Sequence, residues 1–403
     1  MLDKRKLAYT CRRDSELTAR LIDNLLIPLA EDKERLDSLF LQSLDDEYGH
    51  LLEELEPEWI YALVQQYIAY KLFGLHRHVK KYLNEPQLAR RSAREKGFLE
   101  SRLFNLWHFA FARVKEDLGN DFFVMRNVLT KEEFLLYSPG VGKYESDGEH
   151  SLYFILLTFN GECYQTYGPI IPYSGLQPLD LLYFAGQLDE KINEYSEVHQ
   201  KIQEDPVPFM LLMVASTFPL TFHKKDLVVF GLSEVNVASL DLKRWEDSFK
   251  IEEQDGVYEL NLKRWWSHPH FAHCHYAPHD GKFIVSAATE RGWEKLVQVI
   301  NDLGMELDLQ PDACATAAGA IGTERVLGKN GVRSPYGEMF VPEISEEEEA
   351  GLERINNFLN LLMPYLNSKE QYDLRELAVQ AGIAYDEAHM VAKQIKEKFE
   401  KMF

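Results

Sequence analysis

Residues 152–167 read Leu-Tyr-Phe-Ile-Leu-Leu-Thr-Phe-Asn-Gly-Glu-Cys-Tyr-Gln-Thr-Tyr, and they decide the fold class. Two β-rich runs flank Asn160 and Gly161. Asn-Gly is typical of a two-residue hairpin turn, because both turn positions need a positive φ. A second alternating run, from Phe122 to Tyr137, predicts another hairpin around residues 130–132. Several short strands in about 60 residues favour a small barrel-like unit.

The sequence before this unit predicts helices from about residue 14 to residue 118. Pro57 suits the first turn of a helix that we expect to reach Leu83, with apolar residues at helical spacing. A second helix is expected from near Pro86 to Gly119, where its last turns become very apolar. A further helix near 186–203 should close the β-rich unit.

The second half of the chain predicts more strands between residues 222 and 289, followed by a helix at 290–303. Asp255-Gly256 and Asp280-Gly281 each resemble a two-residue hairpin turn. Residues 304–342 are rich in Ala, Gly, Thr and Pro and read as a connector. Ser345 then begins a helix, with Glu348 placed for a capping box.

We therefore expect an α+β protein with an N-terminal helical domain, a small β-barrel-like unit, an α+β sheet unit and a C-terminal helical module. The expected segments are a helical domain at 1–118, a β-rich barrel-like unit at 119–205, an α+β unit at 206–305, a connector at 306–343 and a helical module at 344–403.

Charge and composition limit the classes of function. The net charge of −21 repels polyanions at long range and disfavours broad nucleic-acid binding. The first residues lack an apolar segment typical of a signal peptide, and the apolar run 207–222 is too short to span a membrane. Four scattered cysteines are typical of free thiols in a reducing compartment, so we expect a cytoplasmic protein without a membrane partner.

Histidines are concentrated in one short segment and form the first candidate site. These candidate metal ligands are His268, His270, His273, His275 and His279, with Asp280 beside them. Imidazole nitrogen binds Zn, Fe, Ni or Mn, and a His-x-His pair on a strand points both rings to one face. With a two-residue turn at 280–281, His275 would pair with Ser286, opposite an apolar face that carries Cys274 and Tyr276. The alternative is a polar strand face with a structural or partner-contact role.

A basic island between residues 76 and 102 forms the second candidate site. This segment contains eight Lys and Arg residues and only three Glu residues. Its proposed anion-binding members are Arg77, Lys81, Arg90 and Arg94. On continuous helices each of the pairs 77/81 and 90/94 would share a face, which suits phosphate groups. The alternative is neutralisation by an acidic helix, because residues 45–58 hold seven carboxylates.

Near the C-terminus, residues 374–393 place Leu377 and Ala378 before Gly382, with Val391 beyond it. This spacing resembles a helix-turn-helix. The resemblance covers this segment alone, and no family is recognised for the rest of the chain. Asp386 and Glu387 stand where DNA-reading versions place base contacts, which favours a protein partner.

No known catalytic or nucleotide-binding motif is present in the sequence, and no cofactor is indicated with certainty. We therefore expect a non-enzymatic multi-module protein that binds another macromolecule, with a protein as the expected partner. Two alternatives stay open. One is a metal-dependent enzyme or metal-binding protein that uses the 268–280 cluster, and the other is a DNA-binding regulator that uses residues 374–393.

Overall fold

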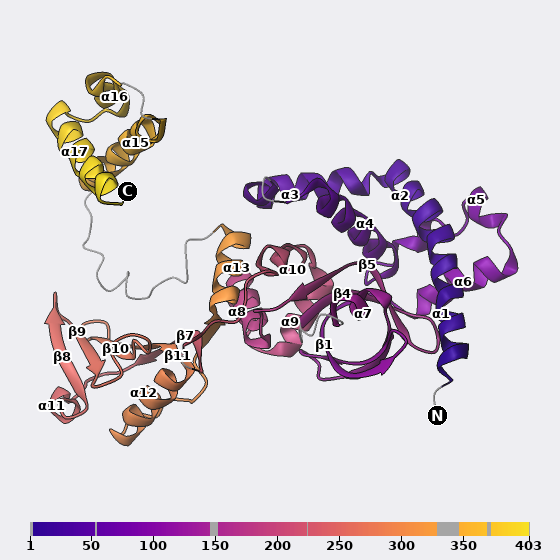
Figure 1. Ribbon diagram of the computed structural model, residues 1–403, viewed down its shortest axis with the longest axis horizontal. Helices are drawn as coiled ribbons and strands as arrows, with labels where there is room; N and C mark the ends of the chain where they lie inside the picture. Colours follow the sequence, from indigo (N-terminus) through magenta and orange to yellow (C-terminus); the bar gives the residue numbers. More distant parts are fainter. Residues whose placement is uncertain are drawn as a thin grey trace. The chain divides into compact units, whose positions relative to one another are not determined.

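The computed structural model describes residues 3–52, 55–145, 152–223, 225–328, 346–368 and 372–402 (Figure 1). The chain divides into two compact units, Met1–Ser334 and Pro335–Phe403. The fold is α+β, with helices at both ends of the chain and a barrel and a sheet between them, as the sequence predicts. None of the helices in these ranges is long and apolar enough to cross a membrane.

The first unit begins with a layer of helices. They are α1 (Lys4–Thr18), the π-helix η1 (Ala19–Leu26), α2 (Ile27–Glu34), α3 (Leu36–Leu52), α4 (Pro57–Phe73), the 3₁₀ helix η2 (His78–Lys81), α5 (Pro86–Ala89) and α6 (Ala93–Phe104). Pro57 occupies the first turn of α4 as expected, but α4 ends at Phe73 rather than Leu83. Ser92 starts α6 with a capping box to Glu95, which separates α6 from α5.

A closed barrel follows, with strand order β1-β2-β3-β5-β4. Its strands are β1 (His108–Gly119), β2 (Phe122–Asn127), β3 (Glu133–Tyr137), β4 (Leu152–Phe159) and β5 (Tyr164–Tyr173), with α7 (Pro139–Glu145) against β5. The expected helix over 86–119 is therefore wrong from residue 108 onward. Ala110 and Ala112 fill the barrel, whereas Phe109 and Phe111 join the core shared with the helices. This alternation has the period of a strand.

The β4–β5 hairpin forms where the sequence predicts it, but its turn is longer. Phe159 pairs with Tyr164, so four residues form the loop instead of two. The Asn160 side chain explains the difference: its Oδ1 accepts hydrogen bonds from the backbone N–H groups of Glu162 and Cys163, each at 2.9 Å. An Asn side chain that closes its own loop replaces the backbone turn.

Helices connect the barrel to a second sheet. They are α8 (Pro178–Leu188), α9 (Tyr195–Glu204), α10 (Val207–Leu211) and the 3₁₀ helix η3 (Leu212–Ala215), so two helices stand where one was expected at 186–203. The sheet has the order β12-β7-β11-β10-β9-β8, and β6 pairs with β7. Its elements are β6 (Phe222–His223), β7 (Asp226–Asn236), α11 (Leu242–Trp245), β8 (Phe249–Gln254), β9 (Val257–Leu262), β10 (His273–Ala277), β11 (Lys282–Thr289), α12 (Glu290–Asp302), β12 (Ala313–Thr316) and α13 (Ala317–Leu327).

Two features of this region correct the sequence expectations. The connector expected at 306–343 contains β12 and α13, and its residues 329–343 lie outside the described ranges, as does Ser345. Ala277 pairs with Lys282, so the hairpin loop has four residues rather than the two expected at Asp280-Gly281. Gly281 has a positive φ of 63° but Asp280 does not, and a two-residue turn of this type needs both.

A buried carboxylate, Asp180, joins α8 to the start of α13. It accepts hydrogen bonds from the backbone N–H groups of Gln177 (2.7 Å) and Thr316 (2.6 Å) and from the Thr316 hydroxyl (2.9 Å). Gly319 is required beside it, because a Cβ at that position would lie 2.1 Å from Asp180 Oδ1. This carboxylate thus links α8 to the residue that caps α13.

The second unit contains α15 (Glu346–Ser368), α16 (Leu374–Ala381) and α17 (Tyr385–Met402). Gly382 ends α16 in the left-handed conformation, with a φ of 71°, and the two helices of the 374–393 segment follow one another as the sequence predicts. Its core is separate from those of the first unit and is built from Phe358, Leu362, Leu377, Ala378, Ala381, Ile383, Ala388 and Ala392.

Candidate functional site

A cleft of about 560 Å³ lies between the N-terminal helices and the outer wall of the barrel. The lining residues come from α1, η1, α4 and strands β4 and β5: Asp14, Ser15, Thr18, Asp23, Tyr61, Ala62, Gln65, Thr158, Gln165, Thr166, Tyr167, Gly168 and Pro169. This volume suits a small organic molecule, since such sites typically measure about 300–1,000 Å³.

The polar wall of the cleft follows from helical spacing in α1. Cys11, Asp14, Ser15 and Thr18 recur at intervals of three and four, so they share the face that packs on the barrel. Gln165 of β5 meets this face, and its Nε2 donates to the carbonyl oxygen of Cys11 (3.1 Å) and to Ser15 Oγ (3.0 Å). A helix face that would ordinarily be apolar is therefore joined to the barrel by hydrogen bonds.

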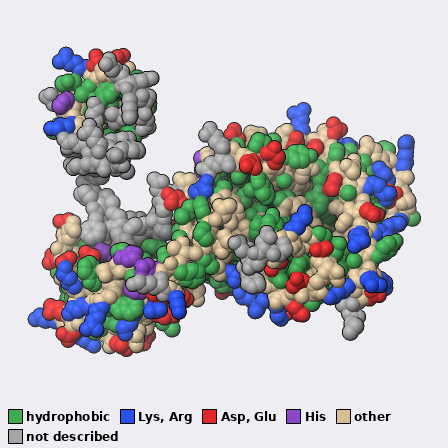
Figure 2. Space-filling model, viewed as in Figure 1, with side chains coloured by type: hydrophobic (Ala, Val, Ile, Leu, Met, Phe, Trp, Pro, Cys, Tyr) green, Lys and Arg blue, Asp and Glu red, His purple; other side chains and the backbone are tan. Residues whose placement is uncertain are grey.

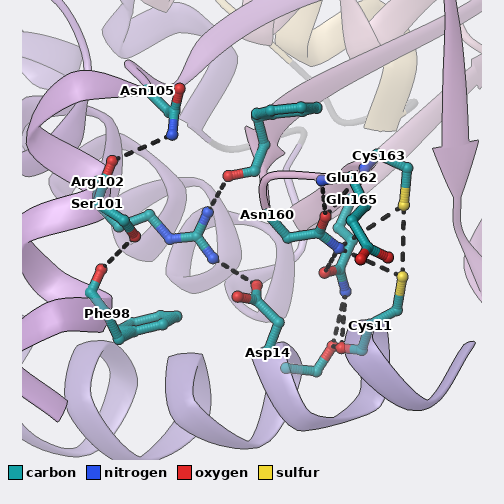
Figure 3. Close-up of polar contacts among 12 residues, drawn as sticks. Cys11, Asp14, Phe98, Ser101, Arg102, Asn105, Asn160, Glu162, Cys163 and Gln165 are labelled. Carbon is teal, nitrogen blue, oxygen red and sulfur yellow. Dashed lines mark hydrogen bonds and ion pairs between the residues drawn. The ribbon is translucent and has the colours of Figure 1, made fainter. Parts of the chain in front are cut away.

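Arg102 contacts Asp14, one of the residues of this wall (Figure 3). Its side chain is only 1% exposed, and Nη2 donates to Asp14 Oδ2 while Nη1 donates to the carbonyl oxygen of Phe159. Burial raises the pKa of Asp14, and the neighbouring guanidinium lowers it by less. The Asp14 carboxylate is therefore only partly compensated by its partner.

The opposite side of the cleft carries a second carboxylate, which belongs to a solvent-exposed residue. Asp23 lies in η1, and π-helical segments are rare and frequently occur at functional sites. Its Oδ1 accepts a hydrogen bond of 2.7 Å from the Tyr167 hydroxyl. Burial raises the pKa of Asp23 more than this hydrogen bond lowers it. Glu31 lies close by, because its Oε1 accepts from Gln65 Nε2 at 2.9 Å.

Thr158 supplies an unused hydrogen-bonding group in the cleft wall. It is 3% exposed, and its hydroxyl has no hydrogen-bond partner in the protein. Leaving a buried hydroxyl unpaired costs about 1–3 kcal/mol. The hydroxyl oxygen exposes less than 1 Å², so a ligand in the cleft can supply the missing partner only if the side chain rotates toward it.

The charges of the cleft select the kind of ligand. Of the described lining residues two are acidic and none is basic. The pKa values of both carboxylates are raised, which means that their ionised forms are disfavoured. A positive charge placed between them would stabilise the ionised forms and would itself be stabilised. Tyr61 is exposed at the rim and offers an aromatic face, which also attracts cations.

The histidine segment lies in the second sheet, where histidine side chains gather on one surface (Figure 2). Cys274, Tyr276, Phe283 and Val285 face the core as predicted, because the register differs from the expected one by two residues and leaves the face unchanged. His273 and His275 therefore share the other face, with ring centroids 5.3 Å apart.

The partners of these histidines differ from the prediction. His273, rather than His275, pairs with Ser286, and its Nε2 lies 3.2 Å from Ser286 Oγ. Burial lowers the pKa of His275 to about 4. Opposite His275 on β9 stands Glu259.

The other candidate ligands are dispersed. The His270 ring packs on Trp265 with Nδ1 2.6 Å from Thr289 Oγ1, whereas His268 stacks edge-on with His223. His279 and Asp280 are exposed in the hairpin loop. Within the described ranges, no group of three or more His, Cys, Asp or Glu side chains is placed to hold a metal ion. The prediction of a metal site gains no support there.

The basic island is also divided by the fold. Arg77 precedes η2 and Lys81 ends it, while Arg90 and Arg94 lie on either side of Ser92, so the expected shared helix faces do not form. Lys81 Nζ lies 3.0 Å from Glu34. Arg77, Arg90 and Arg94 are exposed.

Other ion pairs of this region involve carboxylates near it in space. Arg91 pairs with Glu95, and Arg102 pairs with Asp14. These carboxylates lie outside residues 45–58, the acidic segment that the sequence suggested as the neutralising partner.

No family model matches the sequence, and no match was found among curated proteins or among solved structures.

Sequence reasoning did not identify the cleft. Its members Asp14 and Thr158 are far apart in the chain, and only the fold of the barrel brings them to one cavity. One signal was available: polar residues at 11, 14, 15 and 18 occupy the face that a packed helix normally fills with apolar residues. Arg102 was included in the basic island, but nothing local distinguishes it from its exposed neighbours.

Proposed function

We propose that this protein binds a small organic cation, a protonated amine, in the cleft between α1, η1 and the barrel. The observation that carries the proposal is a pair of carboxylates, the half-buried Asp14 and the exposed Asp23, whose pKa values are both raised in a cleft without a basic lining residue among those described. The net charge of −21 attracts cations to the whole molecule.

Asp23 is expected to be the direct contact for the ammonium group, because Asp14 already accepts from Arg102. The Thr158 hydroxyl is expected to bond to a polar atom of the ligand. We assign no reaction to the cleft, since none of these groups is an activated nucleophile with a paired base.

The test is calorimetric titration of the full chain with 1,4-diaminobutane, with glycerol as a neutral probe. Asp23→Asn is expected to weaken diamine binding by at least about tenfold, because a hydrogen bond to a charged group contributes about 1.5–3 kcal/mol. Asp32→Asn is the matched control, since Asp32 is an exposed carboxylate on the adjacent α2. No binding by the unchanged protein, or equal affinity for the two variants, would contradict the proposal.

A second candidate function is the binding of a protein partner through the second unit. Large apolar side chains are exposed on its helices: Val379 is 80% exposed and Met390 is 62% exposed. Residues 368–403 hold six basic and seven acidic residues, a balance that favours a protein over DNA.

This second proposal is tested by quantitative co-purification with the unchanged chain and with a Val379→Glu/Met390→Glu variant. A specific protein recovered with the unchanged chain and lost with the variant supports it. Recovery that is equal for both, or affinity for duplex DNA that falls steeply with salt, contradicts it.

A further inference from the structure

Two free cysteines from distant parts of the first unit meet beside the cleft (Figure 3). Cys11 lies on α1 and Cys163 in the β4–β5 loop, and their Sγ atoms are 3.4 Å apart although 152 positions separate them. Both side chains are buried, among Leu7, Phe122 and Tyr137. The sulphur atoms need to approach by only about 1.4 Å to reach the length of an S–S bond.

The surroundings favour reaction at one of the two thiols. Asn160 Nδ2 donates to both sulphur atoms, at 3.4 Å to Cys11 and 3.7 Å to Cys163. A hydrogen bond from Cys163 lowers the pKa of Cys11. Cys11 is therefore the member of the pair that more readily forms a thiolate, which is the nucleophilic form.

The remaining cysteines offer an internal comparison. Cys274 lies in the core of the second sheet, where burial raises its pKa, and Cys314 lies on β12, where burial raises its pKa to about 12. The raised pKa values of Cys274 and Cys314 disfavour the nucleophilic thiolate, whereas the pKa of Cys11 is lowered.

We propose that Cys11 and Cys163 are a redox-active dithiol that closes to a disulfide when the protein meets hydrogen peroxide. The Cys11 thiolate attacks one peroxide oxygen, the O–O bond breaks, and hydroxide leaves and becomes water, which gives a sulfenic acid at Cys11. The Cys163 sulphur then attacks the Cys11 sulphur, the S–O bond breaks, and the proton of Cys163 leaves with the hydroxide as a second water. Two thiols and one peroxide thus give one disulfide and two waters.

The disulfide would attach α1 covalently to the barrel. Because it closes a long loop, it is expected to raise the thermal midpoint of the first unit by about 5 °C. Asp14, Ser15 and Thr18 of the same helix line the cleft, so any effect on ligand affinity rests on the proposed function, whereas disulfide formation does not.

The test treats the reduced full chain with a small excess of hydrogen peroxide and analyses it by intact mass and by peptide mapping without reduction. The expected result is the loss of two hydrogen atoms, a cross-linked peptide containing Cys11 and Cys163, and the higher thermal midpoint. Cys11→Ser and Cys163→Ser should each abolish all three changes, and a reducing thiol should reverse them in the unchanged protein.

Other results would overturn the proposal. Both thiols remaining free after the treatment would do so, as would Cys11 accumulating as sulfinic acid without a cross-link. A disulfide that involves Cys274 or Cys314 instead would also contradict it. The ligand titration is independent of these readouts, so failure of the cleft proposal and failure of the dithiol proposal are distinguishable.

Discussion

Thr158 is a single residue in which stability and function oppose each other. Its buried hydroxyl has no partner in the protein, although a valine of nearly the same shape would fill the site without a polar atom. A residue that costs stability in the free protein is expected where a ligand supplies the missing bond.

Thr158→Val is therefore expected to raise the free energy of unfolding of the first unit by about 1 kcal/mol while weakening 1,4-diaminobutane binding. Tryptophan fluorescence reports the first unit alone, because all six tryptophans lie before residue 300. The control is Thr10→Val, at a position on α1 that the described cleft lining does not include. A variant that loses stability and keeps its affinity would contradict this role for Thr158.

Asp180 is the second residue whose environment has a measurable consequence. Burial raises its pKa from 3.8 to about 6, against three hydrogen bonds that lower it. The folded protein therefore holds this proton more tightly than the unfolded chain. The stability that Asp180 contributes is present below about pH 4 and is lost as the pH rises through about 6.

Comparison with Asp180→Asn isolates this effect, because asparagine resembles the protonated carboxyl group and does not titrate. The free energy of unfolding of the unchanged protein, relative to the variant, is expected to fall by about 2 kcal/mol from pH 4 to pH 7. Urea unfolding followed by tryptophan fluorescence measures it. A difference that is constant over this range would show that Asp180 ionises normally.

At the scale of elements, the sequence predicts the length of a hairpin turn correctly where the backbone conformations of the two turn residues determine it. Asp255 and Gly256 both have positive φ values, 50° and 80°, and form the two-residue turn between β8 and β9 as predicted. At Asn160 the side chain closes a four-residue loop instead. The Asn-Gly dipeptide alone does not distinguish this loop from a two-residue turn.

Among the elements that the sequence patterns assigned wrongly, β1 bears most directly on the cleft. The aromatic residues at 107, just before β1, and at 109 and 111 within it fit the apolar face of a buried helix as well as one face of a strand, and a short apolar run does not distinguish the two. Its pairing with β2 and β4 in the closed barrel decides the outcome. The cleft depends on the same long-range pairing, which explains why local patterns did not reveal it.

At the scale of the whole molecule, the two compact units have separate cores. The core of the second unit contains Phe358, fully buried, and a unit of this size has only a few kcal/mol of stability from its core. The first unit buries far more apolar surface in several clusters.

Phe358→Ala is expected to cost about 3–5 kcal/mol and to unfold the second unit at ordinary temperature. Far-ultraviolet circular dichroism should show a loss of helix that leaves the tryptophan unfolding transition unchanged. The control is Leu309→Ala, which removes a large but exposed apolar side chain. A shift of the tryptophan transition by Phe358→Ala would show that the two units unfold together.

The cleft proposal is tested most directly by a crystal structure of the full chain grown with 1,4-diaminobutane. We predict density for the diamine between α1, η1 and the barrel, with one nitrogen within hydrogen-bond distance of Asp23 and the Thr158 hydroxyl paired with the ligand or with a water that it holds. An empty cleft at a saturating concentration of diamine, or density only at other carboxylates, would contradict the account.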